Sequence, residues 1–169
     1  MVAFWLCWGA LVAQRLEELV RARGNTRRLL QQGAVEVAGG HYPLMVLLHL
    51  GWFAGWLAEA QICGVSWNPA WWPLALAGQG LRLWAQAVLG PRWTTRILVV
   101  PGELPVQHGP FALLRHPNYL GVVFELLAFP MIFGAWRTAL AASLLNAALL
   151  SWRIRQEERA WSATTPSGN

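Results

Sequence analysis

Long apolar runs alternate with short polar connections along this chain. Three runs, 2–20, 42–63 and 69–89, come close to the roughly 20 residues that a helix needs to cross the hydrocarbon core of a bilayer. Two later runs, 119–133 and 138–152, are shorter, and helices of that length would rise about 22 Å. The pattern predicts an all-α integral membrane protein of about five transmembrane helices, the last two forming a short hairpin.

The polar segments between and after these runs complete the predicted architecture. Segment 153–161 has the pattern of an amphipathic helix, which we expect on the cytoplasmic side, and residues 162–169 are small and polar, as is typical of a disordered tail. Residues 1–161 then form a single domain. For the final hairpin we expect one of two arrangements: it crosses where the bilayer thins locally, or it enters and leaves on one face.

Arginine is distributed unevenly over the two sides of the predicted bundle, and this asymmetry predicts orientation. The polar segments 21–28 and 90–118 and the C-terminal segment fall on one side, whereas Arg137 alone falls on the other. The first side collects ten arginines: Arg21, Arg23, Arg27, Arg28, Arg92, Arg96, Arg115, Arg153, Arg155 and Arg159. We therefore expect a multi-pass protein of the cell (inner) membrane, with the N-terminus outside and the C-terminus in the cytoplasm.

Composition supports a membrane protein and argues against two other classes of function. The chain is 56% hydrophobic and only 12% charged, against roughly 25% charged residues in an ordinary soluble domain. A net charge of +5 could suit a nucleic-acid partner, but the arginines lie at the ends of apolar runs and form no basic stripe, so we expect no nucleic acid. Cys7 and Cys63 lack metal-ligand spacing, and we expect no metal site.

Four ionisable side chains lie inside the predicted spans, where polar groups are costly. They are His49, Glu59, Arg82 and Glu125. Insertion scales give a central arginine a cost of about 2.5–3.5 kcal/mol, so each such residue is expected either to pair with another or to have a function.

The motif Arg115-His116-Pro117 lies at the start of the fourth apolar run. Proline suits the first turn of a helix, where its missing N–H costs nothing, and it holds the preceding residue extended. The resulting polar turn has free backbone N–H groups and the positive end of a helix dipole, which suit an anionic or strongly polar ligand group. The alternative is an ordinary anchor at the membrane interface.

A second motif, Arg153 with Glu157 and Glu158, follows the last run. Arg153 and Glu157 are four residues apart and share a helical face. Alone, this segment indicates a solvated helix with ion pairs. If it lies beside the Arg115-His116-Pro117 turn, its carboxylates could instead bind a cation or the hydroxyls of a ribose.

Together, segments 109–111 and 115–121 and the Arg153…Glu157-Glu158 motif resemble the isoprenylcysteine carboxyl methyltransferase family and the related membrane phospholipid methyltransferases. The N-terminal half is similar to a bacterial branch of the family associated with polyketide synthases. The chain departs from the family pattern at Ala112-Leu113 and at Trp161.

The resemblance implies S-adenosylmethionine as cofactor and a lipophilic acceptor that arrives from the bilayer, with a carboxylate or a phenolic or enolic hydroxyl as the methylated group. Arg153 would orient the anionic oxygen of the acceptor, Glu125 or a histidine would act as base where one is needed, and His49 would contribute with Arg153 to the acceptor site. The residues it assigns to the cofactor are Arg115, His116, Pro117, Tyr119, Gly121, Glu157 and Glu158.

Two other functions remain open. One is an N-methyltransferase for phospholipid amines, and the other is a non-catalytic membrane scaffold in which tryptophan anchors the interface. Membrane lipids are expected partners in all three cases, and the sequence does not determine an oligomeric state.

Overall fold

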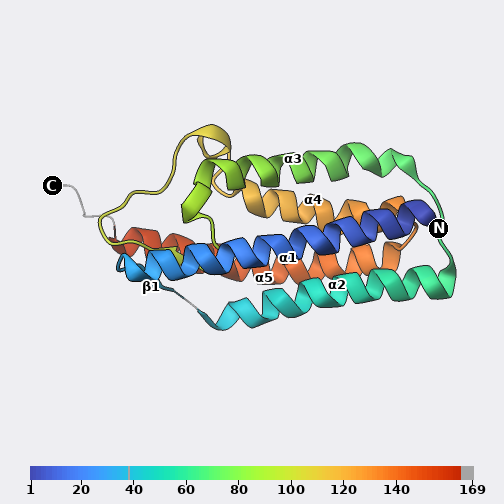
Figure 1. Ribbon diagram of the computed structural model, residues 1–169, viewed down its shortest axis with the longest axis horizontal. Coiled ribbons are helices and arrows are strands. Elements are labelled where there is room, and N and C mark those ends of the chain that lie inside the picture. The colour runs from blue at the N-terminus through green and yellow to red at the C-terminus, as the bar shows by residue number, and fades with distance from the viewer. Residues whose placement is uncertain (38, 165–169) are drawn as a thin grey trace.

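The computed structural model describes residues 1–37 and 39–164 as a bundle of five long helices (Figure 1). The helices are α1 (Val2–Gln31), α2 (Tyr42–Cys63), α3 (Trp72–Leu89), α4 (Pro117–Ile132) and α5 (Trp136–Thr164). The five predicted helices are confirmed, and α2 has the predicted bounds.

The first and last helices are longer than the hydrophobic pattern predicts. α1 has 30 residues and includes the whole segment 21–28, which we had expected to be a connection. α5 has 29 residues and joins the last apolar run to the predicted amphipathic helix without a break. The α1 extension is rich in arginine and leucine and the α5 extension in arginine and glutamate, all of which are good helix formers, so the change in polarity does not end either helix. α5 also includes 162–164 of the predicted tail, while 165–169 lie outside the described residues.

A small antiparallel pair of strands corrects the all-α prediction. β1 (Val35–Glu36), after α1, pairs with β2 (Leu98–Val99), in the connection between α3 and α4. The Arg96 guanidinium reinforces this pairing with a 2.7 Å contact to the Glu36 carboxylate. The pair joins two polar connections that are far apart in the sequence, and it holds the long α3–α4 connection over one end of the bundle.

Helices α3 and α4 pack closely because glycine removes side chains from their interface. A Cβ atom on Gly121 would lie 2.5 Å from Arg82 Cγ and 2.8 Å from the carbonyl oxygen of Gly78. A Cβ atom on Gly78 would lie 2.9 Å from Phe124 Cβ. This close approach brings the first turns of α4 alongside the buried Arg82 of α3.

Hydrogen bonds tie the α4–α5 turn to the α2–α3 link at the other end of the bundle. The Ser66 N–H donates to the Phe133 carbonyl at 3.3 Å, and the Asn68 N–H donates to the Ile132 carbonyl at 2.8 Å. The hairpin of α4 and α5 therefore reaches the same level as the ends of α2 and α3, and the N-terminus lies at this end too (Figure 1).

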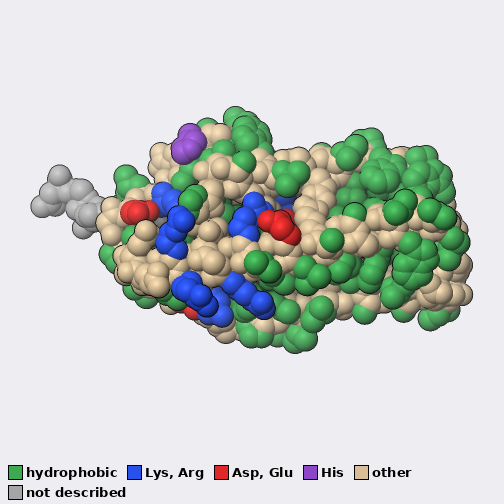
Figure 2. Space-filling model, in the orientation of Figure 1, with side chains coloured by type: hydrophobic (Ala, Val, Ile, Leu, Met, Phe, Trp, Pro, Cys, Tyr) green, Lys and Arg blue, Asp and Glu red, His purple; other side chains and the backbone are tan. Residues whose placement is uncertain are grey.

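Polar and apolar surfaces are separated along the bundle axis. On the face shown in Figure 2, arginine and glutamate gather over the half that contains the C-terminal ends of α1 and α5, while the other half is almost wholly hydrophobic. Among the described residues, one helix, α2, is both long and apolar enough to span a bilayer, and α4 is apolar but shorter, with 16 residues. Trp52, Trp56, Phe4 and Phe133, which are among the largest fully buried side chains, pack together in the hydrophobic half.

Candidate active site

Three helices contribute a buried cluster of charged side chains at mid-bundle. Arg15 of α1 and Arg82 of α3 lie 2.5 Å and 2.6 Å from the same oxygen of Glu18, and both also pair with Glu125 of α4. Two positive and two negative charges balance, which offsets the cost of placing them away from water. Arg82 and Glu125 thus pair within the bundle. We call the four residues Arg15, Glu18, Arg82 and Glu125 the ion cluster.

Glu59 has a different partner set, at the far end of α2. Its carboxylate accepts the Arg137 N–H at 3.1 Å, the Thr138 N–H at 2.8 Å and the Thr138 hydroxyl at 2.8 Å. These are free N–H groups of the first turn of α5, where a carboxylate is favoured. Glu59 therefore joins α2 to the start of α5 and lies far from the polar end of the bundle.

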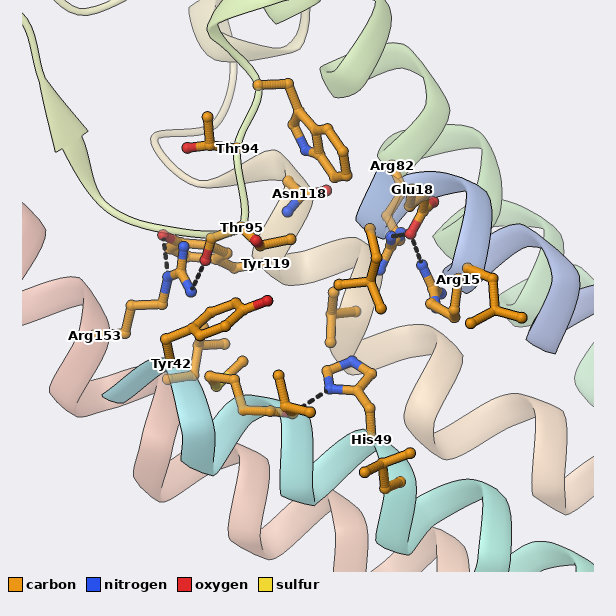
Figure 3. A pocket seen from close by; sticks show the side chains of 18 of the residues that line it. Arg15, Glu18, Tyr42, His49, Arg82, Thr94, Thr95, Asn118, Tyr119 and Arg153 are labelled. Carbon is orange, nitrogen blue, oxygen red and sulfur yellow. Dashed lines mark hydrogen bonds and ion pairs between the residues drawn. The ribbon is translucent and has the colours of Figure 1, made fainter. Parts of the chain in front are cut away.

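A cavity of about 220 Å³, the inner cavity, opens beside the ion cluster (Figure 3). Its walls are mainly apolar side chains of α1 and α2, with contributions from α4 and α5. The apolar lining includes Val12, Leu16, Leu19, Met45, Val46, Leu50, Phe53, Val122 and Leu150. Polar side chains also line it, among them three residues of the ion cluster, His49 from α2 and Arg153 from α5. Both residues that the sequence assigned to the acceptor therefore lie on its wall.

A larger cavity of about 790 Å³, the outer cavity, lies at the arginine-rich end. The α3–α4 connection, the start of α4 and the last turns of α5 form its walls. It brings together six residues that the resemblance assigns to the cofactor: Arg115, His116, Pro117, Tyr119, Glu157 and Glu158. The two motifs, which are separated by the whole α4–α5 hairpin in the sequence, thus meet at one cavity.

The two cavities share a wall at Trp93, Thr94, Asn118, Tyr119 and Arg153. The Arg153 guanidinium lies over the Tyr119 ring, and its Nε donates a hydrogen bond to the Tyr119 hydroxyl oxygen at 2.8 Å. The Tyr119 hydroxyl in turn donates to the Glu157 carboxylate. A second Arg153 nitrogen, Nη1, donates to the Thr95 carbonyl oxygen at 3.0 Å (Figure 3). These contacts fix a buried arginine at the place where the cavities meet.

Several polar atoms of residues that line the outer cavity, two of them at the shared wall, are buried without a hydrogen-bond partner among the described residues. They are His116 Nε2, Asn118 Oδ1 and Trp93 Nε1. The His116 ring stacks on the Tyr119 ring at 5.2 Å, and its Nε2 lies 3.8 Å from the Glu158 carboxylate, beyond hydrogen-bonding distance. An unsatisfied buried polar atom costs about 1–3 kcal/mol, so a group of them at a cavity wall is the expected arrangement where a ligand completes the bonding.

Two residues that the resemblance assigned to the site line neither cavity. Glu125 lies on the wall of neither cavity, and its charge is used in the ion cluster. Gly121 also lies on neither wall, and it has a packing function against α3, which requires the absence of a side chain. We therefore assign neither residue a direct contact with a ligand.

Sequence reasoning missed three residues of the shared wall, Trp93, Thr94 and Asn118. Asn118 lies inside the motif, between Pro117 and Tyr119, and a closer reading of that position could have found it. Trp93 and Thr94 belong to an irregular connection, where no periodicity indicates which side chains face inward.

Comparison with known proteins gives one family and two relatives. The model of the isoprenylcysteine carboxyl methyltransferase (ICMT) family matches residues 71–163. An uncharacterized Bacillus subtilis protein, YpbQ, is 39% identical over 162 residues, covering 93% of this chain and 95% of its own. An uncharacterized protein of Haemophilus influenzae is 25% identical over 169 residues, covering 95% of this chain and 96% of its own. No solved structure matches the chain.

Proposed function

The chain belongs to the isoprenylcysteine carboxyl methyltransferase family, a family of membrane methyltransferases, and from this premise we propose that it transfers a methyl group from S-adenosylmethionine to an oxygen atom of a lipophilic acceptor. The acceptor oxygen belongs to a carboxylate or to a phenolic or enolic hydroxyl. The observation that carries the proposal is the pair of cavities, one polar and one apolar, that meet at Tyr119 and Arg153.

The outer cavity has the donor and acceptor groups that S-adenosylmethionine requires. The Glu158 carboxylate is half exposed beside His116, where it can accept hydrogen bonds from ribose hydroxyls or an amino group. His116 lines the same cavity, and its Nε2 has no hydrogen-bond partner among the described residues, so it is free to bond a polar group of the cofactor after a small side-chain movement. When bound there, the cofactor supplies an electrophilic methyl group on a positively charged sulfur, which the nearby carboxylates of Glu157 and Glu158 favour.

The inner cavity has the lining that a lipophilic acceptor requires. Leu16 of α1 and Leu50 of α2 line this cavity, and these residues are also 59% and 60% exposed on the outer surface of the bundle. Such residues border both the cavity and the surrounding lipid, so an acceptor can enter between α1 and α2 directly from the bilayer. Apolar walls also exclude water, which strengthens electrostatic interactions at the transfer point.

Arg153 has the position to orient an acceptor oxygen. It is 7% exposed, lies on the wall of both cavities and is fixed by Tyr119 and the Thr95 carbonyl. A fixed cation at that point draws an anionic oxygen toward the place where the two cavities meet. Alignment of two reactants in this way can supply several kcal/mol of rate enhancement, on the order of 7–11 kcal/mol in favourable cases.

The same geometry supports a membrane arrangement with five spanning helices. The α4–α5 turn reaches the level of the α2–α3 link, so of the two hairpin arrangements we favour the one that crosses the bilayer. The ten arginines of the polar segments at the opposite end favour a cytoplasmic position for that end, the outer cavity and the C-terminus by the positive-inside rule. The cofactor would then enter from the cytoplasm and the acceptor from the bilayer.

The two other functions have less support. A phospholipid amine carries positive charge, but the Arg153 guanidinium lies on the wall of the inner cavity, and the carboxylate on that wall, Glu18, is already paired with Arg15 and Arg82. A non-catalytic scaffold would not need a polar cavity and an apolar cavity that meet at a buried arginine.

Calorimetry of S-adenosylmethionine binding to the purified protein in detergent tests the proposal. We expect binding by the wild-type chain and weaker binding, by about 5- to 150-fold for a lost contact of about 1–3 kcal/mol, in Glu158→Gln. Glu17→Gln is the matched control, because Glu17 is an exposed carboxylate of α1 that lines neither cavity. Absence of binding to the wild-type protein, or equal affinity in all three proteins, would contradict the assignment of the outer cavity.

A further inference from the structure

His49 lies on the α2 wall of the inner cavity, and its ring points into that cavity between Tyr42 and the side chains of Arg15 and Arg82 (Figure 3). Its Nδ1 lies 2.8 Å from the carbonyl oxygen of Met45, one turn earlier in α2. A carbonyl oxygen can only accept, so Nδ1 carries the proton of the neutral ring. The lone pair is then on Nε2, which faces the middle of the cavity (Figure 3).

The acidic residue on the wall of this cavity cannot accept a proton easily. Both oxygens of the Glu18 carboxylate are occupied: one accepts from Arg15 at 2.5 Å and Arg82 at 2.6 Å, the other from Gln86 at 2.9 Å and Gln14 at 3.3 Å. A carboxylate held by two guanidinium groups is a poor base, because protonation would break both ion pairs.

Other nearby groups are also unsuitable. Glu125 does not border the inner cavity, and the Tyr119 hydroxyl already donates its proton to Glu157. Arginine stays protonated in proteins and cannot act as a base. Among the described residues that line the inner cavity, His49 is therefore the group with both a suitable lone pair and a fixed orientation.

We infer that His49 is the general base that removes the proton from the hydroxyl of the acceptor. This inference rests on the proposed methyltransferase function and deepens it, because it selects a hydroxyl acceptor over a carboxylate. The acceptor O–H bond breaks and its proton moves to His49 Nε2; the oxygen forms a bond to the methyl carbon as the bond from that carbon to the sulfonium sulfur breaks. The products are a methyl ether, neutral S-adenosylhomocysteine and a protonated His49, which later releases its proton to water.

A base is needed for one class of acceptor and not for the other. A carboxylic acid is already ionised at neutral pH, whereas a phenol such as the tyrosine side chain has a pKa near 10 and is almost wholly protonated. A fixed neutral imidazole in the acceptor cavity therefore indicates an acceptor whose hydroxyl lies on an unsaturated carbon and keeps its proton in water.

The test compares two phenols that carry the same alkyl chain. One has no further substituent on its ring, and its hydroxyl is protonated at the assay pH. The other also has nitro groups on its ring, and its hydroxyl is ionised at that pH. Proton removal by a positioned base commonly contributes about 10²- to 10⁴-fold, so we expect His49→Gln and His49→Leu to lose about that factor in kcat with the protonated phenol and to retain most activity with the ionised one. His108→Gln is the matched control, because His108 is exposed and lines neither cavity.

The outcomes separate a base from a structural role. Equal losses on both phenols, or no loss on either, would overturn the inference, since a merely structural histidine would affect both acceptors alike. Methylation of an alkyl carboxylate but of neither phenol by the wild-type protein would also overturn it while leaving the methyltransferase function intact. Calorimetry with S-adenosylmethionine is run on each variant, and unchanged affinity in the His49 variants is expected, because His49 does not border the outer cavity.

Discussion

The residues at the shared wall of the two cavities, and His116 of the outer cavity beside them, are held by contacts that leave part of their bonding capacity unused. Tyr119 is engaged on every side, by the His116 ring, the Arg153 guanidinium and the Glu157 carboxylate. His116 Nε2 and Asn118 Oδ1, by contrast, are buried without a partner among the described residues. Rigid neighbours beside unsatisfied atoms are characteristic of a preorganised ligand site, because the cost of ordering these side chains is met during folding rather than on binding.

His116→Asn tests whether this site binds the cofactor. Asparagine keeps a polar group but lacks the ring that stacks on Tyr119, and it places its amide away from the position of Nε2. Loss of one polar contact costs about 1–3 kcal/mol, so we expect affinity for S-adenosylmethionine to fall about 5- to 150-fold by calorimetry while the melting temperature changes little. Wild-type affinity in a folded His116→Asn protein would make this histidine an interfacial anchor.

At the scale of elements, the packing of α3 against α4 positions the start of α4, and with it Pro117 and Tyr119, beside the outer cavity. Gly121 and Gly78 permit this approach, and the ion cluster then joins both helices to α1. A shift of the N-terminal end of α4 would disrupt either the close packing at Gly121 or the buried ion pairs of Glu125. Both changes would cost free energy of folding. Helix packing thus determines the geometry of the cofactor cavity although Gly121 does not line it.

Gly121→Ala should destabilise the protein through this contact. The added methyl group would meet Arg82 Cγ and the Gly78 carbonyl at 2.5 and 2.8 Å, and overpacking of this kind typically costs about 1–3 kcal/mol. Gly80→Ala is the control on α3, because a Cβ atom there has nothing within 4 Å, and alanine favours a helix over glycine by about 1 kcal/mol. A thermal melt in detergent should show a lower melting temperature for Gly121→Ala and an equal or higher one for Gly80→Ala; the reverse order would refute the packing role.

The sequence predicts the elements better than it predicts the contacts between them. The bounds of α2 follow from an apolar run that begins after Gly39-Gly40-His41 and ends before Gly64, and the family resemblance drawn from the two motifs is confirmed. The ends of α1 and α5 do not follow, since the runs mark where polarity changes and both helices continue into the polar region.

The candidate site shows the same difference. The residues of both motifs lie on one cavity because each motif is local and holds its own turn of helix. The positions of Glu125 and Gly121 depend on Arg82 and Gly78, which are distant in the sequence, and local spacing contains no information on such partners. Trp93 and Thr94 could not be found at all, because they reach the shared wall through an irregular connection that β1 and β2 hold in place.

At the scale of the whole molecule, the bundle has two chemically different ends. One end has the α2–α3 link and the α4–α5 turn, with Arg137 and the exposed Cys63 in contact at 3.3 Å. The other end has the ten remaining arginines of the polar segments and the outer cavity. Because basic segments stay in the cytoplasm, this asymmetry predicts that a soluble cofactor reaches its cavity from the cytoplasm and that Cys63 faces outward.

Labelling with a membrane-impermeant maleimide tests this orientation with the cysteines that the chain already contains. Cys63 is exposed at the end predicted to face outward, whereas Cys7 is partly buried against the hydrophobic core, so we expect intact cells to label the wild-type protein and to leave Cys63→Ser unlabelled. Adding Gln32→Cys to Cys63→Ser places a thiol at the exposed end of α1, on the arginine-rich side. That variant should react only after the membrane is permeabilised, because the reagent must reach the cytoplasmic face. Labelling of Gln32→Cys in intact cells, together with protection of Cys63, would reverse the orientation. The outer cavity would then face the outside of the cell, whereas S-adenosylmethionine is made in the cytoplasm. That result would contradict the proposed function.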